Sequence, residues 1–252
     1  MQNFYQPGVA FQRQMHIFEG EDLIHGVRLL INSIRQYGAL PALSKTIGAV
    51  LLSATTVFAE PVTIAAMGDS LTQGYGLQAE QGFVPQLQAW LTDQGAEVTV
   101  INAGVSGDTT AGGLARAAWT LTPDVDGMIV ALGGNDMLRG IDPATSKANL
   151  KGILEAAATQ DVDVLLVGMQ APGNFGPDYK AAFDGMYPDL ASDFDTLLAP
   201  SFLEGLGSVD PTEVQGLMQG DGIHPNALGV AKIVEVLGPH VLTLIERVQT
   251  SG

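Results

Sequence analysis

Short apolar runs alternate with longer stretches of helical periodicity from Pro61 onward. The apolar runs predict strands, and several are almost uninterrupted, as is typical of parallel strands buried on both faces. The expected strands are Val62–Met67, Val98–Ala103, Met128–Leu132, Val162–Met169 and Leu197–Phe202. The expected helices are Val84–Gln94, Thr110–Leu121, Pro143–Gln160, Asp178–Phe194 and Pro225–Val248. Because strands and helices alternate with short connections, the pattern predicts a three-layer α/β sandwich formed by one domain, residues 60–252.

The first 59 residues have a different pattern. Lys45 precedes an apolar run, Ile47–Phe58, which ends in small residues at Ala59. Such a run is too short to span a bilayer but fits the core of a signal peptide. We therefore interpret residues 1–59 as a leader that contains a signal peptide, and expect a periplasmic or secreted protein. A start codon assigned too early would account for the long lead-in, and the alternative is a genuine N-terminal helix, Asp22–Tyr37, acting as an anchor or regulatory arm.

The chain is strongly acidic, with 27 acidic and 11 basic side chains. Residues 1–59 hold three of the acidic and four of the basic ones, so residues 60–252 hold 24 and seven, a net charge of −17. Such a surface repels phosphate groups and anionic lipid, so we expect no nucleic-acid partner and no stable membrane insertion of the mature domain. The chain has no cysteine, which excludes a thiol nucleophile, a thiolate metal site and disulfides.

Polar, glycine-rich segments follow the first three predicted strands. They are Gly68–Leu71, Asn102–Thr109 and Gly133–Asp136. Ligands bind outside the carboxyl ends of the strands in an open α/β sheet, so we expect these segments to meet at one edge. Within them, we expect Asn102 to be a buried structural hydrogen-bonding group, and Asp69 and Asp136 to brace their loops.

A serine and a histidine are candidates for nucleophilic catalysis. Ser70 stands at a tight strand-to-helix turn, and a serine needs a base before it can act as a nucleophile. After residue 59 the histidines are His224 and His240, and His224 lies in a loop, Asp221-Gly-Ile-His224, just before the last predicted helix. Asp221 is close enough in sequence to orient the imidazole through its other ring nitrogen. The available donors for an oxyanion are the N–H groups of Ser70 and Gly107 and the side-chain amide of Asn135.

These segments together resemble the SGNH, or GDSL, hydrolase superfamily. Gly68–Leu71, Gly107, Gly134–Asp136 and Asp221–His224 are similar to its blocks I, II, III and V. Longer stretches resemble the bacterial branch of arylesterases and acyl-CoA thioesterase I / lysophospholipase enzymes: Gly68–Gly76, Leu132–Gly140, Ala171–Gly176 and Asp221–Asn226. The resemblance covers residues 61–248. One departure is Ala171, where the thioesterase pattern has a leucine, so acyl-chain preference does not follow from the resemblance.

The resemblance implies a flavodoxin-like, five-stranded parallel sheet and a two-step acyl-enzyme mechanism. It assigns Ser70 as nucleophile, His224 as acid and base, Asp221 as its partner, and Ser70, Gly107 and Asn135 as the oxyanion hole. It further implies a monomer that needs no metal or cofactor and acts on small or lipid-like acyl esters and thioesters. A carbohydrate O-deacetylase on the same scaffold is an alternative. A non-catalytic mononucleotide-binding module is disfavoured, because Asp69 in the first loop would repel phosphate.

Export is testable by protein chemistry. N-terminal sequencing of the protein recovered from the periplasm or the medium should begin at Glu60 or within a few residues of it. A chain that starts at Glu60 should fold and hydrolyse esters as well as the full chain does. Loss of folding in that shorter chain would show instead that the first 59 residues contribute to the domain.

Overall fold

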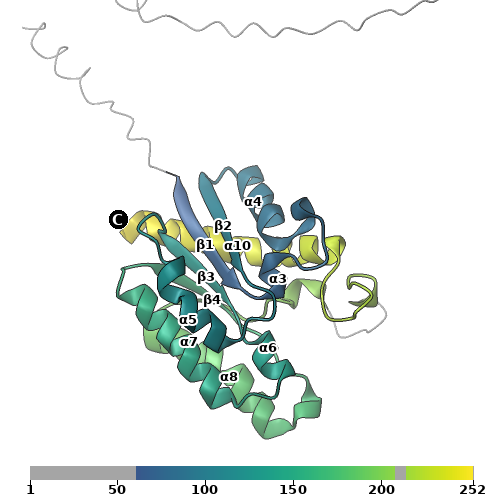
Figure 1. Cartoon of the computed structure of the whole chain (residues 1–252). Coiled ribbons are helices and arrows are strands. Elements are labelled where there is room, and N and C mark those ends of the chain that lie inside the picture. Colours follow the sequence, from purple (N-terminus) through teal and green to yellow (C-terminus); the bar gives the residue numbers. More distant parts are fainter. Residues whose placement is uncertain (1–60, 208–213, 252) are drawn as a thin grey trace, which may run out of the picture. The chain divides into compact units, whose positions relative to one another are not determined.

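The computed structural model describes residues 61–207 and 214–251, so the predicted leader and signal peptide lie outside the described residues. The described part is an α/β fold built on a five-stranded sheet (Figure 1). Its strands are β1 (Val62–Gly68), β2 (Val98–Gly104), β3 (Gly127–Ala131), β4 (Asp163–Val167) and β5 (Leu197–Ala199). All neighbouring strands are parallel and their order is β2-β1-β3-β4-β5, which is the flavodoxin-like order. The predicted fold class is confirmed.

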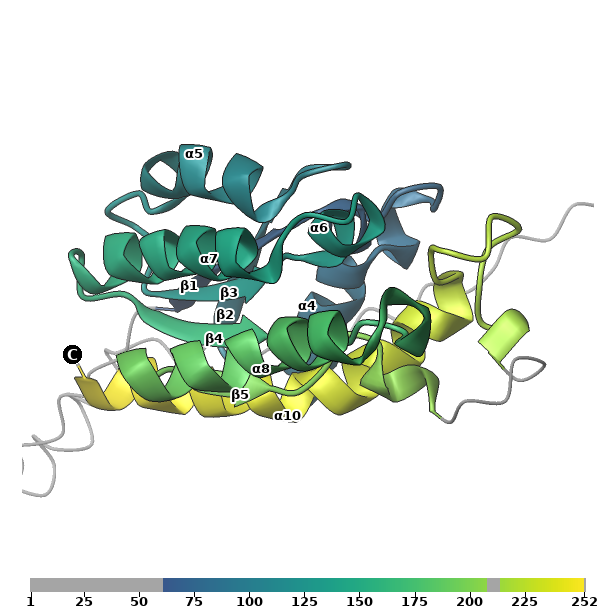
Figure 2. The ribbon, with the colours of Figure 1, turned by 90° about the horizontal axis from the view of Figure 1, so that it is seen from below.

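Helices cover both faces of the sheet and complete three layers (Figure 2). One face carries α4 (Phe83–Asp93) and α10 (Ala227–Ser251), which contact each other. The other face carries α5 (Thr110–Thr120) and α7 (Pro143–Ala158), and α8 (Pro177–Phe194) packs beside α7 and against β4 and β5. Short helices fill the connections: α3 (Ser70–Gln73), α6 (Gly134–Leu138), and the 3₁₀ turns η1 (Ala79–Gln81), η2 (Gly173–Phe175) and η3 (Glu204–Leu206).

The last two strands are shorter than the apolar runs predict. The chain leaves the sheet after Val167 and after Ala199, although apolar residues continue beyond both. Beyond these ends the ladder becomes irregular. The Gly168 N–H still donates to the Ala199 carbonyl, but the Gly168 carbonyl accepts from the Phe202 N–H, one residue later than the register of the two strands requires. The two backbones also approach closely there, since a Cβ on Gly168 would lie 2.4 Å from the Pro200 carbonyl oxygen.

Helix α10 is long and apolar enough to cross a membrane by length and composition. Half of its most apolar window is buried inside the fold, where residues such as Ile233, Leu237 and Leu244 pack into the core beneath the sheet. Its apolar composition is therefore accounted for by its place as a core helix of the α/β domain.

Two helical glycines should respond to alanine in opposite directions. A Cβ on Gly238 in α10 would lie 2.5 Å from the ring of Trp90 in α4, so Gly238→Ala should overpack this contact and lower the free energy of unfolding by about 1–3 kcal/mol. A Cβ on Gly185 in α8 would have no atom within 4 Å. Gly185→Ala should therefore raise the free energy of unfolding by about 0.5–1 kcal/mol, because alanine has the higher helix propensity. Urea unfolding measures both, and destabilisation of equal size at the two sites would contradict the packing explanation.

Candidate active site

Three neighbouring strands, β2, β1 and β3, end in register on one side of the sheet. Gly68, the last residue of β1, pairs with Gly104 at the end of β2 and with Ala131 at the end of β3. The three polar segments predicted to meet therefore leave the sheet side by side. A cleft of about 370 Å³ lies at this edge, a size that is typical of small-ligand sites. Ser70, Gly107, Asn135 and His224 all line it.

Ser70 is the first residue of the short helix α3. Asp69 caps this helix, because its side chain accepts a hydrogen bond from the Leu71 N–H at 2.9 Å. The helix lies against the end of β2, where a Cβ on Gly104 would come within 2.4 Å of the Gln73 nitrogen. Glycine at that position lets α3 pack directly on the strand, and this contact sets the height of Ser70 above the sheet edge.

The imidazole of His224 lies between a hydroxyl and a carboxylate. Its Nε2 is 2.9 Å from Ser70 Oγ, and its Nδ1 is 2.6 Å from Asp221 Oδ2. An ionised carboxylate can only accept hydrogen bonds, so Nδ1 carries the proton that faces Asp221. In the neutral ring, Nε2 is then the acceptor for the Ser70 hydroxyl proton. The structure thus brings together three residues that lie up to 154 positions apart in the sequence.

Asp221 is held in its ionised form although it is partly open to solvent. Its Oδ1 accepts hydrogen bonds from the backbone N–H groups of His224 and Ile223. The His224 N–H bond, then the imidazole bond and the Ile223 N–H bond, hold the pKa of Asp221 well below its usual 3.8. The Asp-x-x-His spacing therefore does two things at once, since the loop that presents the ring also stabilises its anionic partner.

Two residues that the sequence did not single out fix this loop further. The Tyr75 ring packs on the His224 ring, with centroids 4.7 Å apart and planes tilted by 38°. Gln219 donates from Nε2 to the carbonyls of Tyr75 and Pro225, and so ties the turn after α3 to the His224 loop. Tyr75 lies within the glycine-rich stretch that carries the family resemblance, but nothing in its spacing predicts contact with a histidine 149 positions later.

Three N–H donors are available to bind an anion at this edge of the sheet. In the described part of the chain, the backbone N–H groups of Ser70 and Gly107 have no hydrogen-bond acceptor. Gly107 has a φ of +82°, a left-handed conformation that glycine adopts without strain. Asn135 donates one of its two amide hydrogens to Asp69 Oδ2 at 3.2 Å, which leaves the other available.

Buried hydrogen bonds hold the loops that carry these donors. The fully buried carboxylate of Asp136 accepts from the N–H and hydroxyl of Thr110 and from the Ser146 hydroxyl, and so joins α6 to α5 and α7. The bracing roles predicted for Asp69 and Asp136 are confirmed. The prediction for Asn102 is wrong in one respect: its side chain bonds to the Gly104 N–H and the Gln73 carbonyl, but it is exposed, because β2 is an edge strand.

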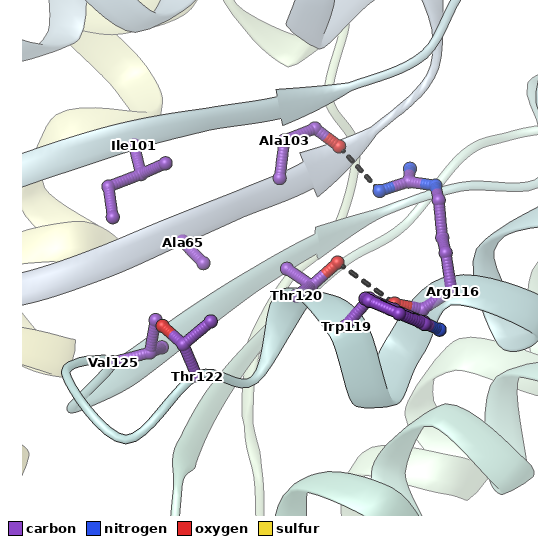
Figure 3. Close-up of a pocket in the computed structure, with 8 residues that line it drawn as sticks. All are labelled: Ala65, Ile101, Ala103, Arg116, Trp119, Thr120, Thr122 and Val125. Atoms are coloured by element: carbon purple, nitrogen blue, oxygen red, sulfur yellow. Dashed lines mark hydrogen bonds between the residues drawn. The ribbon is translucent and has the colours of Figure 1, made fainter.

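Arg116 joins the ends of β1 and β2 from the α5 side. Its guanidinium donates to the Ala103 carbonyl (Figure 3). It also donates to the Gly68 carbonyl and to the Asp108 carboxylate. Because Gly68 and Asp108 are neighbours of the Ser70 turn and of Gly107, this one side chain links both loops of the site. Arg116 also borders a second groove, of about 300 Å³, lined mainly by apolar residues such as Ile101, Trp119 and Val125 (Figure 3). Among the described residues that line this groove, none is a nucleophile paired with a base.

The chain is similar in sequence and in structure to known proteins. Residues 66–232 match the model of the GDSL-like Lipase/Acylhydrolase family. "Esterase TesA" of Pseudomonas aeruginosa is 41% identical over 199 residues, which cover 79% of this chain and 96% of that protein. "Thioesterase 1/protease 1/lysophospholipase L1" of Escherichia coli K12 is 38% identical over 166 residues, 65% of this chain and 76% of that protein. The crystal structure of AlinE4, an SGNH-hydrolase family esterase, is 43% identical, with a TM-score of 0.61 over 73% of this chain and 97% of that one.

Removing the imidazole separates its contribution to the low Asp221 pKa from that of the backbone N–H groups. In His224→Ala the backbone N–H donors of residues 223 and 224 remain, so the Asp221 pKa should rise only part of the way back toward 3.8. Carboxyl-detected ¹³C NMR titration of the wild type and the variant measures the difference. A complete return to 3.8 would show that the imidazole alone sets the charge of this carboxylate.

Proposed function

The chain belongs to the GDSL-like lipase/acylhydrolase family and is a serine ester hydrolase, and we propose that Ser70 is its nucleophile, His224 its acid and base, and Asp221 the carboxylate that orients His224. One observation carries this proposal: the His224 imidazole bridges Ser70 Oγ and Asp221 Oδ2 at 2.9 and 2.6 Å. A hydroxyl, an imidazole and an ionised carboxylate in that order are the requirements of nucleophilic acyl transfer.

In the first step, Ser70 Oγ attacks the carbonyl carbon of the bound ester while its proton passes to His224 Nε2. The imidazolium that forms is stabilised by the Asp221 carboxylate on its other side. Collapse of the tetrahedral intermediate breaks the bond to the alcohol oxygen, or to the sulfur of a thioester, and the leaving group takes the proton from Nε2. The products of this step are an acyl-serine and a free alcohol or thiol.

In the second step, His224 Nε2 accepts a proton from water, and the hydroxide oxygen attacks the acyl-serine carbonyl. The second tetrahedral intermediate releases the carboxylic acid, and Ser70 Oγ regains its proton from the imidazolium. The balance is one ester and one water converted to one acid and one alcohol, with the enzyme unchanged. Every proton that moves in these two steps passes through His224 Nε2.

The oxyanion of both intermediates is proposed to rest on the Ser70 N–H, the Gly107 N–H and the Asn135 amide. The two backbone donors are unpaired in the described residues, and the Asn135 amide retains one free hydrogen. Donors that are already oriented and shielded from water stabilise developing negative charge without reorganising. The Arg139 side chain, which donates to the Gly107 carbonyl at 2.8 Å, helps to hold the Gly107 peptide in place.

The cleft favours esters that carry an apolar acyl group. Beyond the polar groups it is lined by Met137, Leu138, Met169, Leu203 and Ile223. Burying an acyl chain on such side chains contributes about 0.8 kcal/mol per CH₂ group, whereas an acetyl group gains little from them. This lining supports an arylesterase, thioesterase or lysophospholipase substrate range over a carbohydrate O-deacetylase. The same lining fits small or lipid-like ester substrates. The apolar run before Ala59 supports a periplasmic or secreted location for the enzyme.

The first test concerns the nucleophile and the substrate range. The wild type should hydrolyse p-nitrophenyl esters and acyl-CoA thioesters with kcat/KM rising from acetyl to longer chains, and Ser70→Ala should abolish turnover without changing the melting temperature. A fluorophosphonate probe should modify Ser70 alone, as read by peptide mass spectrometry. Ser106 lines the same cleft, and its labelling in place of Ser70 would show that Ser70 is not the nucleophile.

The second test concerns Asn135. Loss of one oxyanion donor typically lowers kcat by about 10²–10³-fold, and the bond strengthens only in the transition state, so KM should stay nearly constant. Asn135→Ala should therefore combine a large fall in kcat with a melting temperature within a few degrees of wild type. A kcat within about threefold of wild type together with a clear loss of stability would make Asn135 a loop brace only.

A further inference from the structure

Asp69 is a buried carboxylate that lies between the Ser70 turn and the segment that carries Asn135. Its exposed fraction is 3%, and burial raises its pKa above the usual 3.8. Its two oxygens have different partners: Oδ1 accepts from the Leu71 N–H at 2.9 Å and Oδ2 accepts from Asn135 Nδ2 at 3.2 Å. One side chain therefore contacts both the helix that presents Ser70 and the side chain that is proposed to donate to the oxyanion.

The cap of α3 does not require a carboxylate. Asparagine and serine cap helices about as well as aspartate does, and neither costs the desolvation of a charge. A negative charge beside a developing oxyanion is also unfavourable in itself. The second oxygen of Asp69, the one that faces Asn135, is what distinguishes it from these neutral caps.

A carboxamide has two orientations that differ by exchange of its oxygen and nitrogen. If the Asn135 carbonyl oxygen faced the oxyanion, the two negative groups would repel each other. An ionised carboxylate accepts hydrogen bonds and cannot donate them, so Asp69 Oδ2 stabilises the orientation with Nδ2 toward itself and the second N–H free. Because the amide is planar, fixing one N–H also fixes the direction of the other.

We propose that Asp69 is a positioning residue that holds the Asn135 carboxamide in the orientation that donates to the oxyanion. The inference rests on the proposed oxyanion role of Asn135. Asp69 acts through Asn135 and does not touch the substrate, so its contribution belongs to kcat and disappears when the Asn135 amide is absent.

Asp69→Asn is the sharpest variant. Asparagine retains an oxygen for the Leu71 N–H, but it turns an NH₂ group toward Asn135, and donor then faces donor. We expect kcat to fall by about 10- to 100-fold with KM within about twofold, toward the limit set by loss of a whole oxyanion donor. In the Asn135→Ala background, the same Asp69→Asn change should lower kcat by less than about threefold, because the group through which it acts is gone.

Two further variants separate positioning from bracing. Asp136→Asn alters the other buried carboxylate of these loops, which has no bond to the Asn135 side chain, so its effect on kcat should be the same in both Asn135 backgrounds. The exchange Asp69→Asn with Asn135→Asp restores a hydrogen bond with donor and acceptor reversed. Its melting temperature should recover relative to Asp69→Asn, whereas kcat should stay low because a carboxylate now faces the oxyanion.

The outcomes are distinct. Equal losses of kcat from Asp69→Asn in the two Asn135 backgrounds, recovery of kcat in the exchanged pair, or a rise in kcat on removing the charge would each overturn the positioning role. If Asp69→Asn does not fold, Asp69→Ser supplies the same comparison, since it keeps the cap and lacks the second oxygen. Activity that survives Ser70→Ala would refute the proposed function itself, independently of Asp69.

Discussion

The arrangement of the site depends on three parallel strands that end on one line, at Gly68, Gly104 and Ala131. The backbone hydrogen-bond ladder sets this register, and a shift of one residue in any strand would move the loop behind it by about 3.3 Å. Ser70, Gly107 and Asn135 each follow one of these ends by two to four residues. Short loops have little freedom to correct such a shift, so the precision of the sheet is passed directly to the polar groups above it.

Buried hydrogen bonds then fix the orientation of the loops and side chains that follow these strand ends. Asp136 joins three helices beneath the Asn135 loop, Arg116 joins the carbonyls at the ends of β1 and β2, and Asp69 links the Ser70 turn to Asn135. These polar groups lie where water is largely excluded, and an unpaired partner there would cost about 1–3 kcal/mol. The same bonds that stabilise the fold therefore restrict the motion of the residues proposed to act on the substrate. The Asp221–His224 loop is more open, and it is held by its own backbone N–H groups and by Tyr75.

Periodicity and glycine-rich segments were sufficient to predict the sheet, the five main helices and the edge at which the polar residues meet. Chain order could also suggest Ser70, His224 and Asp221, because the chain has so few histidines. The ends of β4 and β5 were missed because the pairing becomes irregular where the Gly168 carbonyl accepts from the Phe202 N–H, which is a tertiary effect. The prediction that Asn102 is buried was wrong because its exposure depends on the position of β2 at the edge of the sheet, and the local sequence pattern does not give the strand order. Contacts such as Tyr75 with His224 and Arg116 with Gly68 join residues far apart in sequence, and local pattern carries no information about them.

The position of His224 along the chain has a consequence for biosynthesis. Ser70 and the glycine-rich loops are translated first, and His224, the proposed base, follows in the loop that immediately precedes α10, the last core helix. A nascent chain that has released β1 to β5 but not yet packed α10 holds a serine with no base, and a chain truncated before residue 224 has the same defect. The proposed Ser70–His224 pair can therefore form only after almost the whole chain has been translated, so an incompletely synthesised molecule lacks the proposed catalytic pair.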